Sequence, residues 1–235
     1  MANSLIFAGH SSREYGVVVS GPAAFNAPER DVTAVPIPGR SGDLLLDNRR
    51  WKNIPIRYPA FVWRDFQTQA SLIRAWLSAD AAAYHRLEDD YDPTIFRMAR
   101  FVGPLEFLPR ALNSAADFAI FFDAKPQRFL KSGEAEQTIT NGGTIANPTD
   151  QESAPLIGVN NAVTGAVLTV NGIDIEFAQT VASATIDCAV GEAMPSSVNG
   201  QIYCPIFPTL SPGLNTVSWT GTIGSVKITP RWWTL

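Results

Sequence analysis

The pattern of apolar and polar positions predicts a chain of short strands with a single helix. Phe66, Ala70, Ile73 and Leu77 recur at helical spacing, which predicts a helix over residues 65–79 with Asp65 as its N-cap. Elsewhere in the first half, runs rich in β-branched and aromatic residues are typical of strands. These runs are 4–9 and 15–20, expected to form a hairpin, then 54–62, 84–87, 96–101, 103–108 and 118–122.

The second half is dominated by Thr, Val, Ile, Asn and Gly and contains three Asn-Gly pairs, at 141–142, 171–172 and 199–200. Both residues of such a pair accept the positive φ that a type I′ turn requires, so each pair predicts a hairpin. Short strands separated by turns at this spacing predict an antiparallel sandwich or barrel.

The last predicted strand, 226–229, leads into Trp232 and Trp233 beside Arg231. Large aromatic rings at a chain end are more often buried than free. We expect this pair either to close its own domain or to pack on a neighbouring chain.

The stretch 35–62 does not fit a self-contained domain. Two apolar runs, 44–46 and 54–58, are separated by the charged block 47–53 and preceded by 36–43, where two prolines and two glycines oppose regular pairing. An extended segment of this kind more often lies along a partner, where a strand edge supplies main-chain hydrogen bonds. We therefore predict an arm that makes the protein a component of an assembly.

The net charge of −4 is unevenly distributed. Residues 1–131 carry sixteen Lys/Arg and fourteen Asp/Glu, whereas residues 132–235 carry two and eight, so +2 and −6 add to the total. Such a step indicates a domain boundary, and we predict domains 1–132 and 133–235. The only cysteines, Cys188 and Cys204, fall in the second domain, where two buried thiols are favoured over a disulfide.

Motifs for catalysis and for metal or phosphate binding are absent from the sequence. The two histidines are far apart, and no nucleophile elbow, phosphate-binding loop or dinucleotide fingerprint occurs. We therefore expect no enzymatic activity, no catalytic residues, no metal site and no cofactor. No segment is long and apolar enough to span a membrane, and the first residues lack the pattern of a signal peptide, so we expect synthesis in the cytoplasm and no membrane partner.

Two charged clusters have alternative interpretations. The acidic run Glu88, Asp89, Asp90 and Asp92 could bind calcium or supply a glycosidase pair, but a solvated turn or a charged subunit contact is the favoured interpretation. The second cluster comprises Arg49, Arg50, Lys52 and Arg57. Acidic residues interleave with it and the whole chain is acidic, so we expect no sequence-specific nucleic-acid binding.

Several segments together resemble the distal tail protein (Dit) family of long non-contractile-tailed bacteriophages. They run in order from the arm to the C-terminus: 35–45 (VPIPGRSGDLL), 54–59 (IPIRYP), 84–93 (YHRLEDDYDP), 103–106 (GPLE), 123–133 (DAKPQRFLKSG) and 228–233 (ITPRWW).

The resemblance implies a mainly β protein. Its N-terminal domain would be β-sandwich-like, with one α-helix and an extended hairpin arm, and would form a ring, usually of six subunits. Its C-terminal domain would be a galectin-like antiparallel β-sandwich. The ring would join the tail tube protein to a tail-tip or fibre-carrying protein of the tail-associated lysin type, so the virion tail tip is the expected location.

Ring closure needs two different surfaces on each subunit, and the arm would supply one of them. The candidate inter-subunit contacts are Pro38, Gly39, Arg40, Gly42, Asp43, Leu45 and Arg49. The alternative is a carbohydrate-binding adhesion module that uses Trp219 and neighbouring aromatic residues of the second domain. At 235 residues the chain has little room for the inserted carbohydrate-binding modules of longer relatives.

Overall fold

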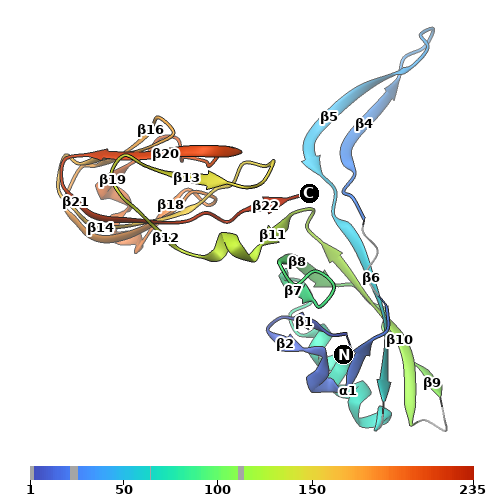
Figure 1. The fold of residues 1–235 in the computed structure, drawn as a ribbon. Helices are drawn as coiled ribbons and strands as arrows, with labels where there is room; N and C mark the ends of the chain where they lie inside the picture. The colour runs from blue at the N-terminus through green and yellow to red at the C-terminus, as the bar shows by residue number, and fades with distance from the viewer. Residues whose placement is uncertain (1–2, 22–25, 64, 111–113) are drawn as a thin grey trace. The chain divides into compact units, whose positions relative to one another are not determined.

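The computed structural model describes residues 3–21, 26–63, 65–110 and 114–235, and the chain forms two compact units. The first comprises Met1–Arg128 together with Leu235, and the second comprises Phe129–Thr234. The predicted domains, 1–132 and 133–235, have their boundary four residues after the boundary between these two units. That the two domains have different functions stays a prediction. The predicted mainly β class, with antiparallel sheets, is confirmed (Figure 1).

The first unit is built on an antiparallel sheet in the order β2-β1-β7-β8-β10-β6-β3, with β9 on β10. Its strands are β1 (Leu5–Phe7), β2 (His10–Ser11), β3 (Val17–Val19), β6 (Ile54–Trp63), β7 (His85–Asp89), β8 (Ile95–Phe101), β9 (Leu108–Arg110) and β10 (Ala115–Ala124). The longest pairing joins β6 and β10 from Ile54↔Ala124 to Trp63↔Ala115. Alternate residues of both strands point into the core, which fixes this register.

One α-helix, α1 (Phe66–Ser78), packs on this core. Ala70, Ile73, Trp76 and Leu77 are buried, which confirms the predicted helix and most of its apolar face. The Trp76 Nε1 donates to the Phe7 carbonyl at 3.1 Å. The predicted N-cap is wrong in its chemistry: Asp65 stands at the cap position with φ 46°, but its side chain makes no capping hydrogen bond.

Two strand predictions in the first unit are wrong. Residues 4–9 and 15–20 do not form one hairpin, because β1 pairs with β2 and β7, whereas β3 pairs with β6. A 3-10 turn, η1 (Ser12–Tyr15), occupies the start of the second run and directs the chain to the other edge of the sheet. Residues 103–107 are not a strand, and pairing resumes only at β9.

The second unit is a sandwich of two five-stranded antiparallel sheets, in the orders β12-β21-β14-β17-β18 and β13-β20-β15-β16-β19. The strands are β12 (Gln137–Ile139), β13 (Gly143–Asn147), β14 (Leu156–Ala162), β15 (Val167–Val170), β16 (Ile173–Phe177), β17 (Val181–Asp187), β18 (Glu192–Met194), β19 (Ile202–Tyr203), β20 (Gly213–Thr220) and β21 (Ile223–Thr229). Inward-facing aliphatic residues of both sheets form one core. The short strands β11 (Arg128–Leu130) and β22 (Trp233–Thr234) pair with each other, and the 3-10 turns are η2 (Lys131–Glu134) and η3 (Ser196–Gln201).

Only one of the three Asn-Gly pairs forms the predicted hairpin. Asn171 and Gly172 adopt φ 50° and 80° between β15 and β16. Asn141-Gly142 instead connects β12 and β13, which belong to different sheets. Asn199-Gly200 lies inside η3, so that prediction is also wrong.

Trp232 is 3% exposed within the core of the second unit. The backbone around it is held by Leu130, whose N–H donates to the Trp232 carbonyl at 2.9 Å. The Trp233 Nε1 donates to the Glu152 carbonyl at 2.8 Å. The chain end therefore closes its own sandwich, as one of the two interpretations expected.

Candidate interaction surfaces

The most unusual element is a two-stranded ribbon, the arm, formed by β4 (Arg30–Pro36) and β5 (Asp43–Trp51) (Figure 1). Among the residues that the structure describes, it pairs with no other strand. The prediction that residues 36–43 avoid pairing is wrong at the two ends, because Pro36 and Asp43 form the last pair of the ladder. The charged block 47–53 does not break the strand either, since β5 continues to Trp51.

Both faces of the arm carry exposed aliphatic side chains. Leu45 lies opposite Ala34 on one face and is 66% exposed, whereas Leu44 and Leu46, 46% and 48% exposed, lie on the other. An isolated two-stranded ribbon is at best marginally stable in water. Exposed leucines on both faces are typical of a surface that is covered in a working assembly.

The tip of the arm contains most of the predicted contact residues. Pro38, Gly39, Arg40 and Gly42 lie in the turn, and the Arg40 N–H donates to the Ile37 carbonyl at 3.2 Å. Both glycines adopt positive φ, 79° and 86°, which residues with a Cβ rarely do.

The remaining predicted contact residues lie along β5. Asp43 begins the strand and Leu45 is its third residue. Arg49, with φ 57°, sits near the base of the arm, where the register is irregular. The structure thus brings six of the seven candidates together in the outer part of the arm and leaves Arg49 apart, while their role as contacts stays a prediction.

Cross-strand ion pairs join the two strands at the base of the arm. Arg30 binds Asp47 through two hydrogen bonds of 2.9 and 2.7 Å, and Arg50 Nε donates to Asp31 at 2.6 Å. Hydrogen bonds from Arg30 and from the Arg49 backbone lower the pKa of Asp47, and those from Arg50 and Asn48 lower the pKa of Asp31. Of the predicted basic cluster, Arg50 is thus paired with Asp31, and Lys52 is paired with Glu29 at 3.2 Å.

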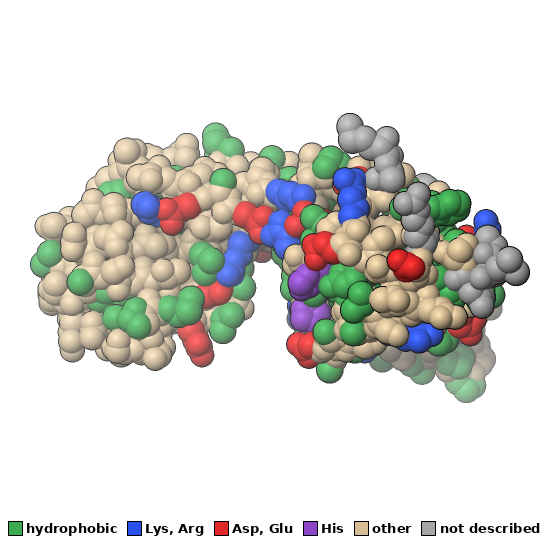
Figure 2. All heavy atoms as spheres, turned by 90° about the horizontal axis from the view of Figure 1, so that it is seen from below, with side chains coloured by type: hydrophobic (Ala, Val, Ile, Leu, Met, Phe, Trp, Pro, Cys, Tyr) green, Lys and Arg blue, Asp and Glu red, His purple; other side chains and the backbone are tan. Residues whose placement is uncertain are grey.

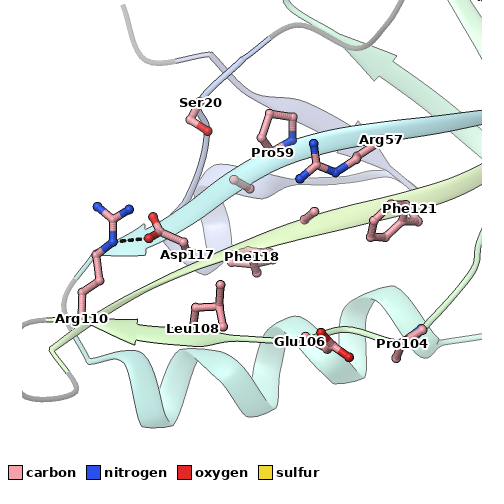
Figure 3. Close-up of a pocket in the computed structure, with 12 residues that line it drawn as sticks. Ser20, Arg57, Pro59, Pro104, Glu106, Leu108, Arg110, Asp117, Phe118 and Phe121 are labelled. Atoms are coloured by element: carbon pink, nitrogen blue, oxygen red, sulfur yellow. Dashed lines mark ion pairs between the residues drawn. The ribbon is translucent and has the colours of Figure 1, made fainter.

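A second open surface, which we call the groove, lies on the outer face of β6 and β10 (Figure 3). It is a hollow of about 710 Å³, and its floor includes the cross-strand pairs Pro59↔Ala119 and Arg57↔Phe121. The Arg57 guanidinium lies 5.9 Å from the centre of the Phe121 ring. At one end, Arg110 forms an ion pair with Asp117.

Sequence reasoning missed the groove, although a signal was present. The outward positions of β6 and β10 include Pro59, Phe61, Ala119 and Phe121, so both faces of these strands are partly apolar. Strands that are apolar on both faces are typical of sheets covered on both sides. In the described residues, the core covers only the inner face of this pair.

The acidic run 88–92 makes hydrogen bonds and ion pairs within the first unit. Asp89 accepts a 2.5 Å hydrogen bond from the buried Tyr58 hydroxyl, and burial raises the Tyr58 pKa. Asp90 accepts from the Ser4 backbone and side chain at 2.8 Å, and Asp92 pairs with Arg128 at 2.6 Å. Asp90 is nevertheless exposed and also pairs with Arg13 at 3.2 Å, so the favoured interpretation, a solvated turn or a charged subunit contact, stays a prediction. Within the described ranges, no cluster of three or more potential metal ligands is present.

In the second unit, Trp219 packs partly against the core. Its carbonyl accepts a hydrogen bond from Asn141 Nδ2 and its N–H donates to Asn141 Oδ1, at 2.8 Å each.

Cys188 and Cys204 are free thiols, both half-buried. Few charged side chains appear on the face of this unit shown in Figure 2. In the part of the chain that the structure describes, no helix is long and apolar enough to cross a membrane.

Neither a protein-family model nor a curated protein matches the sequence. The structure, however, matches the crystal structure of the Dit protein (gp 19.1) of phage SPP1 over 100% of both chains, with a TM-score of 0.75 and 11% identity. This chain has the fold of a distal tail protein. The SPP1 Dit protein is described as a paradigm of the hub adsorption apparatus in phages that infect Gram-positive bacteria.

A second structure, the phage P2 baseplate in its activated conformation with calcium, contains a chain that matches with a TM-score of 0.53 and 10% identity. The match covers 97% of this chain and 98% of that one. At such low identities the likeness shows the distal tail fold and does not identify partners.

Proposed function

We propose that this chain is a structural subunit of a phage tail tip, where copies close into a homohexameric ring. The ring joins the tail tube protein to the tail-tip or fibre-carrying protein of the tail-associated lysin type. The first domain, 1–132, forms the ring, and the galectin-like second domain, 133–235, stays peripheral. The full-length likeness to the SPP1 Dit protein supports this proposal.

The observation that carries the proposal is the arm. It exposes Leu44, Leu45 and Leu46 on a ribbon that pairs with no other strand of the described part of the chain. A ring uses a heterologous interface, in which each subunit offers one surface and receives another. An exposed apolar arm on each copy provides the offered surface without a large flat patch. The contact candidates Pro38, Gly39, Arg40, Gly42, Asp43, Leu45 and Arg49 all belong to it.

The alternative, a carbohydrate-binding module that uses Trp219 and neighbouring aromatic residues, has less support, because Trp219 packs partly against the core of its unit. No catalytic role is proposed for any residue.

The arm can be removed without cutting a domain. Residues 31–50 are replaced by an Asn-Gly turn that joins Arg30 to Trp51, which are already cross-strand partners. The wild type is expected to give the mass of a closed ring by light scattering and annular particles by electron microscopy, whereas the deletion variant is expected to give folded monomers. Rings of the deletion variant would refute the role of the arm.

A point variant sharpens this test. Leu45→Asp places a charge on the most exposed leucine of the arm and is expected to reduce ring formation. Leu214→Asp is the matched control, because Leu214 is 76% exposed on β20 of the second unit. The control is expected to form rings like the wild type.

A further inference from the structure

We infer that the groove on β6 and β10 of one copy receives the Leu45 face of the arm of a second copy, with Asp43 of the arm paired to Arg57 of the groove. This inference rests on the proposed ring. To the proposed ring it adds the surface that receives the arm and the pair of charges that sets the register of the arm on the groove.

Both surfaces are apolar and open. The groove presents Pro59, Ala119 and the 40% exposed Phe121, with the 66% exposed Leu108 at its rim. The arm presents Leu45 beside Ala34. Covering these side chains with one another removes apolar area from water on both copies, which is the main driving force of association.

The groove is lined by Arg57 and Glu106 besides the paired Arg110 and Asp117, and of these side chains Arg57 suits the charge of Asp43. In the described residues, neither Arg57 of the groove nor Asp43 of the arm takes part in an ion pair, whereas the neighbouring Arg110, Asp117 and Asp47 are all paired. Arg57 lies beside the apolar residues of the groove and Asp43 beside the apolar residues of the arm, so these two residues can form an ion pair when the apolar surfaces meet. Electrostatic complementarity of this kind fixes register more than it adds affinity.

The spacing along the two strands also agrees. Asp43 and Leu45 lie two residues apart on one face of β5, and Arg57 and Pro59 lie two residues apart on the outer face of β6. Residues two apart in a strand are separated by about 6.6 Å. When Leu45 sits over Pro59, Asp43 therefore comes within reach of Arg57.

The occupant is a second copy because the arm cannot reach its own groove. Only Lys52 and Asn53 connect β5 to β6. The Lys52 N–H donates to the Glu29 carbonyl at 2.8 Å, and the Asn53 amide donates to the Tyr84 hydroxyl at 2.5 Å, so the link is held in place. A two-residue link fixed at both positions does not let the arm fold back over the strand that follows it.

The test is a charge exchange in the full-length protein. Arg57→Asp and Asp43→Arg are each expected to raise the concentration needed for ring formation by about tenfold or more, because each places like charges together. The double variant restores opposite charges in exchanged positions and is expected to recover most of the loss. Ring formation is measured by sedimentation or mass photometry across a dilution series.

Two controls test for general charge effects. Arg74→Asp changes an exposed arginine on α1 whose guanidinium lies 5.2 Å from the centre of the Phe107 ring, and Glu176→Arg changes an exposed carboxylate on β16. Each is expected to form rings like the wild type, and circular dichroism checks that every variant is folded.

The outcomes distinguish a failure of the proposed contact from a failure of the proposed ring. If the wild type forms rings but the double variant is no better than the single variants, the Asp43–Arg57 contact is overturned and the ring stands. If the single variants assemble like the wild type, the groove does not receive the arm. If the wild type forms no ring, the proposed function itself fails.

Discussion

Asp187 and Arg231 face each other through two hydrogen bonds, 2.7 Å from Nη1 to Oδ1 and 2.9 Å from Nη2 to Oδ2. The pair joins the end of β17 to the segment that follows β21. The Asp187 side chain is only 13% exposed. Since the neighbouring Trp232 completes the core, this ion pair holds the last turn of the chain onto the sandwich.

We predict that Asp187→Asn destabilises the second unit by about 1–3 kcal/mol at neutral pH, because an amide cannot accept both guanidinium hydrogen bonds. Hydrogen exchange of residues 129–234 measures this loss apart from the first unit. The control is Asp174→Asn, whose exposed carboxylate accepts only from Thr169 at 2.7 Å, and it is expected to cost less than about 0.5 kcal/mol.

The loss should depend on pH in a defined direction. Hydrogen bonds from Arg231 lower the pKa of Asp187 in the folded state, although burial opposes the shift. The stabilisation is therefore complete above the unfolded value of about 3.9 and is lost as the pH falls through the lowered folded value. A difference between wild type and Asp187→Asn that stays the same from pH 7 to pH 2 would contradict this.

Gly133→Ala is predicted to destabilise the second unit by about 2 kcal/mol or more. A Cβ at this position would stand 2.3 Å from the Trp232 backbone nitrogen, and backbone held by hydrogen bonds cannot move aside cheaply. Gly200→Ala is the matched control, because nothing lies within 4 Å of its added Cβ and its φ is not positive. Equal midpoints for the two variants in chemical denaturation would show that the close approach is unimportant.

The two thiols are predicted to be unreactive in the folded protein. Burial raises the pKa of Cys188 to about 12 and also raises the pKa of Cys204, and the thiolate is the reactive form. At pH 7.5 we expect iodoacetamide to modify Cys188 about 100-fold more slowly in the native state than in denaturant. Mass spectrometry of timed samples gives both rates, and similar values would overturn the prediction.

The sequence pattern predicted the elements that are formed by residues close together in the chain. Helix α1 was recognisable because its buried residues recur every three or four positions. The turn at Asn171-Gly172 was recognisable because its flanking strands pair directly with each other. At Asn141-Gly142 the same dipeptide connects two sheets, and nothing in the neighbouring residues records which sheet each strand joins.

The candidate surfaces depended on pairings distant in sequence. The arm was predicted from its prolines, glycines and leucines, but the extension of β5 to Trp51 depends on ion pairs with Arg30 and Asp31 across the ribbon. The groove is formed by β6 and β10, whose partners are separated by more than fifty residues, as in Trp63↔Ala115. Composition alone could indicate only that some apolar surface needed a cover.

The short connection between β5 and β6 has a mechanical consequence. Tension applied to the arm enters β6 at Ile54 and runs along the strand, which is bonded to β10 over its entire length. Force in that direction loads the backbone hydrogen bonds of the ladder together instead of opening them one at a time. In the proposed ring, the strand pairing that anchors the arm in its own subunit would thus be loaded in shear, and would not open strand pair by strand pair.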